Sequence, residues 1–285
     1  MLMPILLGLV LGLLTALPLA WKWELGVART AAFIAAAGAA SGLAVVLLGG
    51  AVELGGAVAA LLVWGFTMVL AVGVLAYRFY RDPERTAPTG EGVIVSPADG
   101  EVLYVREARG GILPTASKHG REYPLEELTR TPLRHRDATV VGIAMSFLDV
   151  HVNRAPIGGR IALQRHFAGT FASLKKPEVV FQNERTTTVI ERDGLQVAVV
   201  QIASRLVRQI VSLVKEGQDV VLGERIGVIR FGSQVDLVLP ARPELRVVAH
   251  PGIRLRAGES VVALVTKDTD AGMASPAPDD RAADR

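Results

Sequence analysis

Three long apolar stretches dominate the first 77 residues, which contain only four formally charged side chains. They span Met1–Ala20, Thr30–Gly50 and Ala51–Ala76. About 20 apolar residues in a helix cross the roughly 30 Å hydrocarbon layer of a bilayer, so each stretch predicts a membrane helix. A cleaved signal peptide is the alternative for the first stretch, but the basic leading segment of such a peptide is missing. A buried helical hairpin would need more polar residues on each helix.

The pattern then changes to short β-rich runs separated by Gly and Pro. Alternation and β-branched residues favour strands, and Asp-Gly, Gly-Gly and Pro-Gly pairs are typical of the turns between them. The expected strands lie at 93–95, 102–105, 139–145, 187–190, 197–202, 226–230, 235–239 and 261–265. One short helix is expected around Ser204–Val214. The sequence predicts a mainly β (α+β) fold, an antiparallel β sandwich or partly open barrel preceded by N-terminal transmembrane helices.

These patterns divide the chain into three parts. Residues 1–77 are expected to form a membrane anchor of two to three helices, and residues 78–267 the β domain. Residues 268–285 consist mainly of Pro, Ala, Asp and Arg, with almost no large apolar side chain. We expect this tail to be disordered because it cannot bury enough apolar surface to fold.

Basic residues determine the expected orientation of the anchor. Lys22 and Arg29 lie between the first two apolar stretches, and Arg78, Arg81 and Arg85 follow the third. Three crossings place both groups on one side of the membrane, and the positive-inside rule makes that side cytoplasmic. We therefore expect a cell-membrane protein whose β domain faces the cytoplasm.

The β domain is also basic, with 27 basic and 21 acidic residues between positions 78 and 267. A basic domain held beside a bilayer suits anionic lipid headgroups. Nucleic acid is the usual alternative, but it would explain neither the anchor nor the lack of aromatic-rich binding runs. The chain has no cysteine, and its five histidines show no metal-binding spacing. We expect neither a metal nor a nucleic-acid partner.

Three polar islands interrupt the apolar strand pattern. They are Ser96–Gly100, with the sequence Ser-Pro-Ala-Asp-Gly, then Phe147–Pro156, which contains His151, and finally Ile229–Asp236, which contains the Gly232-Ser233 pair. Taken singly, the first is typical of a turn, the second of a buried core histidine and the third of a bulge. No one of them predicts a catalytic site.

Together, and in this order, the islands resemble the phosphatidylserine decarboxylase proenzyme family, particularly its short bacterial and archaeal branch. The matching strings are Arg81-Asp82-Pro83-Glu84-Arg85, Ser96-Pro97-Ala98-Asp99-Gly100, Asp149-Val150-His151-Val152-Asn153-Arg154-Ala155-Pro156, Asn183-Glu184-Arg185, Gln201-Ile202-Ala203 and Arg230-Phe231-Gly232-Ser233. The resemblance covers about residues 77–265, and the ordered set is far more specific than any single string.

The resemblance implies a proenzyme that cuts itself between Gly232 and Ser233. The Ser233 hydroxyl attacks the preceding carbonyl, His151 takes its proton, and Asp99 holds the imidazole. Elimination of the resulting ester and loss of ammonia leave a pyruvoyl group, derived from Ser233, as the covalent cofactor. Its ketone forms a Schiff base with the amine of phosphatidylserine, and His151 protonates the carbanion that decarboxylation leaves. The implied product is phosphatidylethanolamine.

The implied partners are a phospholipid substrate, the membrane and the chain's own two pieces, 1–232 and 233–285; a homodimer stays open. One position departs from the family's longer members, which carry a second histidine where this chain has Arg154. Arginine cannot act as a general base, so either His151 serves both steps or another group, such as His166, contributes. Arg154 is a candidate ligand for the lipid phosphate or carboxylate, because a planar guanidinium suits both.

Two other functions remain open. The same headgroup chemistry would serve archaetidylserine, a lipid with ether-linked chains. A non-enzymatic, lipoyl-like membrane adaptor fits the anchor and the similar turns at 214–220 and 255–261. Such adaptors usually carry a long helical hairpin, however, and no heptad run is present.

Overall fold

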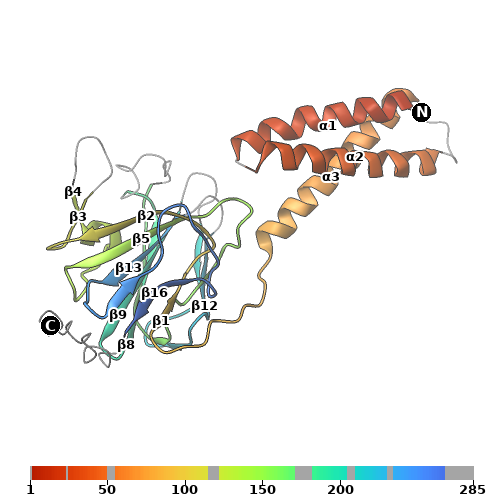
Figure 1. Ribbon diagram of the computed structural model, residues 1–285. Coiled ribbons are helices and arrows are strands. Elements are labelled where there is room, and N and C mark those ends of the chain that lie inside the picture. Colours follow the sequence, from red (N-terminus) through yellow and green to blue (C-terminus); the bar gives the residue numbers. More distant parts are fainter. Residues whose placement is uncertain are drawn as a thin grey trace, which may run out of the picture.

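The computed structural model describes residues 2–23, 25–49, 55–114, 122–170, 182–203, 209–229 and 234–266. The N-terminal part forms the helices α1 (Leu2–Lys22), α2 (Val27–Gly49) and α3 (Gly56–Tyr80). Within the described ranges, these three helices are long and apolar enough to cross a membrane, as the sequence predicts. Figure 1 shows them as a bundle beside the β domain, with the end of α3 leading into it.

The third helix is longer than its apolar stretch. It continues past Ala76 to Tyr80, because no helix breaker occurs before Pro83. The added residues include the aromatic Tyr77, Phe79 and Tyr80, which are typical of a membrane interface. The helix therefore brings aromatic side chains to the surface of the β domain.

Small residues let the three helices pack closely. A Cβ at Gly8 would come within 2.7 Å of the Ala60 carbonyl oxygen on α3, and one at Gly42 would come equally close to the Ile5 side chain. Close backbone approach of this kind is typical of membrane helices. Large apolar side chains point outward instead, with Leu47 72% and Val69 69% exposed. That outer surface is suited to lipid and would be costly in water.

The β domain contains sixteen strands among the described residues, and every pair of them is antiparallel. They are β1 (Val93–Val95), β2 (Gly100–Ala108), β3 (Ile112–Pro114), β4 (Glu122–Pro124), β5 (Ala138–Ala144), β6 (Val152–Arg154), β7 (Gly159–Phe167), β8 (Arg185–Arg192), β9 (Leu195–Ile202), β10 (Ile210–Ser212), β11 (Asp219–Val220), β12 (Arg225–Ile229), β13 (Gln234–Pro240), β14 (Leu245–Val247), β15 (Arg254–Leu255) and β16 (Val261–Val265).

One large curled sheet organises the domain. Its eight strands follow the order β11-β7-β8-β9-β13-β5-β2-β15. Two three-stranded sheets, β1-β16-β14 and β10-β12-β6, contribute residues to a single core with one face of the large sheet. The predicted fold class, antiparallel β in a sandwich or partly open barrel, is therefore confirmed.

The opposite face of the large sheet carries a second, smaller core. It is covered by the β3–β4 hairpin and by the short helix α4 (Leu125–Thr129), which the sequence pattern did not predict. The helix expected around Ser204–Val214 is wrong for Ile210–Ser212, which form strand β10 against β12. The β-branched Ile210 and Val211 favour this pairing. Residues 204–208 and the tail from position 267 lie outside the described residues.

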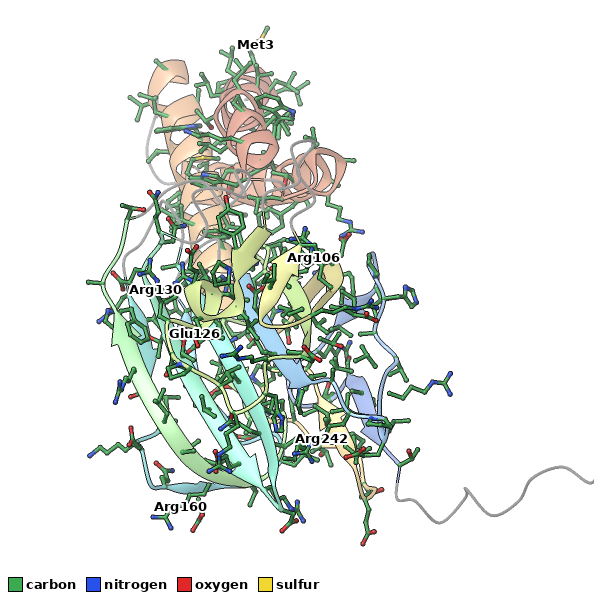
Figure 2. The ribbon with its side chains drawn as sticks, turned by 90° about the vertical axis from the view of Figure 1, so that its left-hand side faces the viewer. Met3, Arg106, Glu126, Arg130, Arg160 and Arg242 are labelled. Atoms are coloured by element: carbon green, nitrogen blue, oxygen red, sulfur yellow. The ribbon has the colours of Figure 1, made fainter. Side chains whose placement is uncertain are left out.

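Figure 2 gives the second view, turned by 90°. Met3, on the helical bundle, lies at one end of the molecule, and Arg160 and Arg242 lie toward the opposite end of the β domain. The apolar helices and Arg160 therefore lie at opposite ends of the molecule.

Candidate active site

His151 directly precedes β6 and is buried, with 2% of its surface exposed. Its carbonyl oxygen accepts a hydrogen bond of 3.0 Å from the Ile229 amide, which attaches it to the end of β12. The ring of Phe79, from the last turn of α3, lies 4.3 Å from the imidazole, centroid to centroid. Among the described residues, neither ring nitrogen of His151 has a hydrogen-bond partner. An unsatisfied buried imidazole is unusual and indicates a functional group.

Burial lowers the pKa of His151 below its ordinary value, because the charged imidazolium loses its water. The backbone of Asp149, two residues earlier, and the nearby carboxylates of Asp149 and Asp99 oppose this shift with smaller effects. The Asp149 carboxylate itself accepts hydrogen bonds from the Ser146 amide and hydroxyl, both 2.7 Å, and from Arg254, at 2.5 Å. His151 is therefore neutral at neutral pH and able to accept a proton.

Asp99 lies at the end of the Ser96–Gly100 turn, and its carboxylate is saturated with donors. Arg85 binds it through both terminal guanidinium nitrogens, and the Ala257 amide donates at 2.8 Å. The hydrogen bonds with Asp99 raise the pKa of Arg85, so this guanidinium stays charged. Gly100 follows at φ +150°, where a Cβ would collide with the Ala144 carbonyl oxygen, so only glycine fits.

The structure brings Asp99 and His151 together through the backbone. Asp99 accepts a 3.4 Å hydrogen bond from the amide of Val150, the residue before His151. The expected hydrogen bond between the carboxylate and the imidazole is not present in the described part of the chain. Asp99 thus holds the peptide that carries His151, while the ring remains available. The catalytic roles given to the two residues remain predictions.

Arg154 points into the protein, where its guanidinium contacts three neighbouring groups. Its guanidinium donates to the carbonyl oxygens of Gly223, at 2.9 Å, and Pro83, at 3.0 Å, and lies 3.4 Å from Asp82. Only 5% of the side chain is exposed. These contacts favour a structural role for Arg154, and binding of a lipid headgroup by this residue stays an untested prediction.

The residues from Arg81 to Arg85, which we call the strap, connect the anchor to the site. Arg81 donates to the Leu148 carbonyl oxygen at 3.0 Å, next to the turn that carries His151. Arg225 on β12 binds both Asp82, at 2.6 Å, and Glu84, at 2.7 Å. With the contacts of Arg85 and Arg154, all five strap residues bind parts of the site. The charged residues of the strap therefore attach it to the site through ion pairs and hydrogen bonds.

The buried side-chain amides of Gln201 and Asn153 connect β9, β6 and the Ser96–Gly100 turn. The Gln201 side chain donates to Asn153 at 2.8 Å, and Asn153 donates to the Pro97 carbonyl oxygen at 3.3 Å. Both side chains are fully buried. Sequence reasoning gave neither residue a role, although each is a polar residue inside an apolar strand run. The pair fixes the strand β6 beside the Ser96–Gly100 turn.

A second buried group lies at the start of β13. Gln234 donates to Tyr104 at 2.9 Å and to Asp236 at 2.7 Å, and the Tyr104 hydroxyl donates to the same Asp236 oxygen at 2.9 Å. The other Asp236 oxygen has no partner among the described residues. Complete burial raises the pKa of Asp236 to about 6. Sequence reasoning missed this group, because Tyr104 and Asp236 are 132 positions apart.

The Asn183-Glu184-Arg185 string has a structural explanation. The fully buried Arg185 donates to the carbonyl oxygens of Glu127, at 3.0 Å, and Leu128, at 2.7 Å, at the end of α4. Burial lowers its pKa to about 10. A cation at a helix C-terminus is favourable, so Arg185 attaches α4 to the sheet.

Gly232 and Ser233 lie outside the described residues, but the chain on each side of them is described. Before the junction, Ile229 is the last residue of β12, and its amide donates to the His151 carbonyl oxygen. After the junction, Gln234 begins β13 and pairs with Ala144 on β5 and Ile202 on β9. His166, the alternative base, lies exposed on β7 with Nδ1 3.1 Å from the Thr186 hydroxyl. Among these candidates, His151 is the one held next to the predicted cleavage junction.

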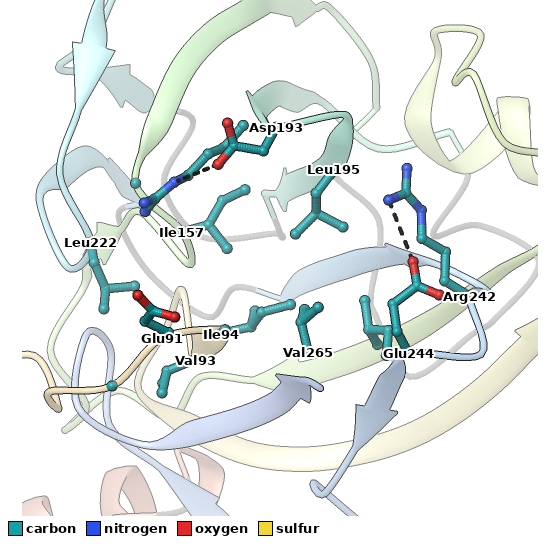
Figure 3. Close-up of a pocket in the computed structure, with 15 residues that line it drawn as sticks. Glu91, Val93, Ile94, Ile157, Asp193, Leu195, Leu222, Arg242, Glu244 and Val265 are labelled. Atoms are coloured by element: carbon teal, nitrogen blue, oxygen red, sulfur yellow. Dashed lines mark hydrogen bonds and ion pairs between the residues drawn. The ribbon is translucent and has the colours of Figure 1, made fainter. Parts of the chain in front are cut away.

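A separate cavity lies away from these residues. It has a volume of about 480 Å³ and an apolar lining that includes Ile94, Ile157 and Leu195, with the ion pairs Arg192–Asp193 and Arg242–Glu244 at its edge (Figure 3). Of the described residues, its lining contains neither Asp99 nor His151 nor Arg154. Because it carries none of the predicted chemistry, we do not assign the active site to it.

Comparison with known proteins identifies the family to which the chain is similar. The sequence model of the family described as phosphatidylserine decarboxylase matches residues 72–263. A phosphatidylserine decarboxylase proenzyme of Erythrobacter litoralis is 40% identical over 69% of this chain and 74% of its own length. One of Saccharopolyspora erythraea is 39% identical over 74% and 84%, respectively. A candidate archaetidylserine decarboxylase proenzyme of Methanothermobacter thermautotrophicus is 40% identical over 68% and 85%.

The fold, the site and these relatives define a decarboxylase proenzyme with apolar, membrane-associating helices. The chain belongs to the phosphatidylserine decarboxylase family. Membership favours the enzyme over the adaptor that the sequence alone left open.

Proposed function

We propose that the chain cleaves itself between Gly232 and Ser233 and then decarboxylates phosphatidylserine to phosphatidylethanolamine. The observation that carries the proposal is the position of His151, a buried imidazole whose nitrogens have no partner among the described residues. Its carbonyl binds Ile229, four residues before Ser233. A proton acceptor is thus attached to the strand that leads into the cleavage junction.

In self-cleavage, the Ser233 hydroxyl oxygen bonds to the Gly232 carbonyl carbon as the neutral His151 accepts the hydroxyl proton. The peptide C–N bond then breaks, and the Ser233 nitrogen takes up a proton, which leaves the two pieces joined by an ester. The pieces separate when the Ser233 Cα loses a proton and its Cβ–O bond breaks, releasing the Gly232 carboxylate. Water then hydrolyses the resulting enamine to a ketone and ammonia. The lowered pKa of His151 keeps it ready to accept a proton at neutral pH. Asp99 and Arg85 hold the Val150 peptide and so fix where the imidazole lies.

The family implies a pyruvoyl group, which Ser233 would provide, and the residues fit such a group. A buried imidazole without partners among the described residues can exchange protons with reacting atoms beside it, and the apolar Phe79 excludes water from it. When formed, the pyruvoyl group supplies a carbonyl that binds the substrate amine and withdraws the electron pair left by carbon dioxide. His151 would accept the proton that the substrate ammonium loses on binding this carbonyl, and would then deliver that proton to the substrate carbon from which carbon dioxide has left.

The anchor supports a lipid substrate at the cytoplasmic face of the cell membrane. The end of α3 contacts His151 directly, so the site lies where the helix leaves the bilayer. Lys22, Arg78 and Arg81 lie at this end of the bundle, and the positive-inside rule places it in the cytoplasm.

The two pieces are expected to stay together after cleavage. The smaller piece supplies β13, which lies between β5 and β9 in the middle of the large sheet. Seven residues of β13 pair with β5 and five with β9, and Val235, Leu237 and Leu239 are buried in the main core. Separating the pieces would expose this core to water.

The proposal is tested by measuring the masses of the polypeptides in the purified protein. Wild type is expected as two pieces, residues 1–232 and 233–285, with the N-terminus of the smaller piece blocked to Edman sequencing. Ser233→Ala is expected as one intact chain without decarboxylase activity. An intact wild-type chain with full activity, or a small piece that begins with a free serine, would contradict the proposal.

Archaetidylserine is the second candidate substrate, because two relatives at 40% identity carry that name. Its headgroup is the same, so the site residues accept both lipids equally well. Turnover of ester-linked and ether-linked serine phospholipids in matched vesicles separates the two. We expect the ester-linked lipid to react at least as fast.

A further inference from the structure

An aromatic cover lies over His151 where the anchor meets the β domain. Its members are Phe79 at the end of α3, Phe147 in the turn before His151, and Trp23 after α1. The ring centroids of Phe79 and Phe147 are 5.2 Å apart, and Trp23 stacks on Phe147 at 5.7 Å with 9° between the planes. Two of the three rings thus belong to the anchor and one to the catalytic domain.

Phe79 is the member that touches the imidazole. Its ring lies 4.3 Å from that of His151, tilted by 40°, and only 4% of the residue is exposed. Tyr80, the next residue, packs edge-on against Phe79 at 5.0 Å. The contact holds one face of the imidazole in an apolar environment and restricts its rotation.

The strap fixes the position of Phe79. Arg81, two residues later, donates to the Leu148 carbonyl oxygen, and Asp82 binds Arg225. The end of the helix therefore cannot move away from the 147–151 turn without breaking these bonds. The cover is part of a connected structure rather than a loose contact.

We propose that Phe79 is a positioning residue of the active site, which covers the His151 imidazole and orients it for proton transfer at the membrane surface. The inference rests on the proposed catalytic role of His151. It makes the membrane helix a part of the reaction site as well as an anchor. A lipid headgroup would reach His151 past this ring, directly from the bilayer surface.

The main test is chemical modification of His151, because it does not require activity. Diethyl pyrocarbonate reacts with neutral imidazole, so its rate at each pH reports both the access to the ring and its pKa. Full-length protein in phosphatidylcholine nanodiscs is treated over a range of pH, and peptide mass spectrometry measures each histidine. The exposed His166 and His250 serve as internal controls.

In Phe79→Ala, we expect diethyl pyrocarbonate to modify His151 at least 10-fold faster than in wild type, and the pH midpoint of the reaction to move upward. The shift is upward because water then solvates the imidazolium. Turnover of phosphatidylserine is expected to fall about 10-fold in kcat with KM within twofold, and Phe79→Leu should recover most of it. Tyr77→Ala, at an exposed aromatic residue of the same helix end, should match wild type.

Unchanged modification rate and midpoint at His151 in Phe79→Ala would overturn the proposal. If that variant does not fold, Phe79→Val decides, because its short side chain also leaves the imidazole face open: a midpoint above that of wild type supports the cover, and a wild-type midpoint overturns it. Failure of the proposed function is distinct. It would appear as full decarboxylation by a His151→Ala variant, whatever the modification data show.

Discussion

Asp99 and His151 are close in space, yet their surroundings are opposite. The Asp99 carboxylate receives four hydrogen-bond donors, two of them from Arg85. The His151 imidazole receives none from the described residues and lies against an aromatic ring. Asp236 is intermediate, since one of its oxygens is bonded and the other has no partner within the described ranges.

This difference suggests different roles for the Asp99–Arg85 pair and for the His151 imidazole. A buried charge is tolerable only when it is paired, so the strap side is built for stability. A buried group without partners costs stability and persists where its reactivity is used. We therefore expect the chemistry at His151 rather than at the paired charges of the strap.

The largest effect is expected from His151→Ala. Removing a general acid–base catalyst typically costs about 10²–10⁴ in rate, so both self-cleavage and decarboxylation should fall by at least about 100-fold. The melting temperature should fall only moderately, because the lost ring makes no hydrogen bond in the described structure but leaves a cavity beside Phe79. Cleavage is measured by gel and turnover by release of carbon dioxide. Near-normal turnover would move the role to another group, with His166 next in line.

Arg85→Met tests the opposite side of the comparison. It leaves the buried Asp99 carboxylate unpaired, which typically costs about 3–5 kcal/mol of stability. Thermal unfolding in detergent should show a large drop, and the double variant Arg85→Met/Asp99→Asn should recover part of it. Arg109→Met, in an exposed ion pair with Glu107, should show no measurable change. Equal stability of the two arginine variants would refute the saturated-charge interpretation.

Asp236→Asn tests the intermediate case through pH. The pKa of Asp236 is about 6 in the folded protein and about 3.8 ordinarily, so the folded state binds more protons between these values. The free energy of unfolding therefore decreases as pH rises through this window, by roughly 3 kcal/mol at most. The free energy of unfolding is measured at pH 4 and at pH 7. It should decrease between these values in wild type and should not show this decrease in Asp236→Asn. Asp193→Asn, at an exposed position, should keep the wild-type slope.

The smallest effect is expected from Arg154→Lys. Lysine keeps the charge but cannot reach Gly223, Pro83 and Asp82 together, so stability should fall by about 1–2 kcal/mol. KM for phosphatidylserine should stay within twofold of wild type. A KM raised fivefold or more, with unchanged stability, would instead support direct binding of the lipid headgroup by Arg154.

Much of the fold followed from local pattern. The apolar stretches gave three helices, and the alternating runs gave most of the strands. The expectation failed at Ile210–Ser212, which were expected in a helix but pair with β12 as a strand. It also missed α4, a helix of five residues that Arg185 attaches to the sheet.

The sequence by itself determined the anchor, the antiparallel β class and the family, because these depend on hydrophobic period and on the order of short strings. Only the tertiary structure decided that Arg85 and not His151 binds Asp99, that Arg154 is enclosed by the strap, and that Phe79 covers His151. Each of these contacts joins residues distant in the chain. Such contacts depend on how strands and helices pack, and no local period encodes that.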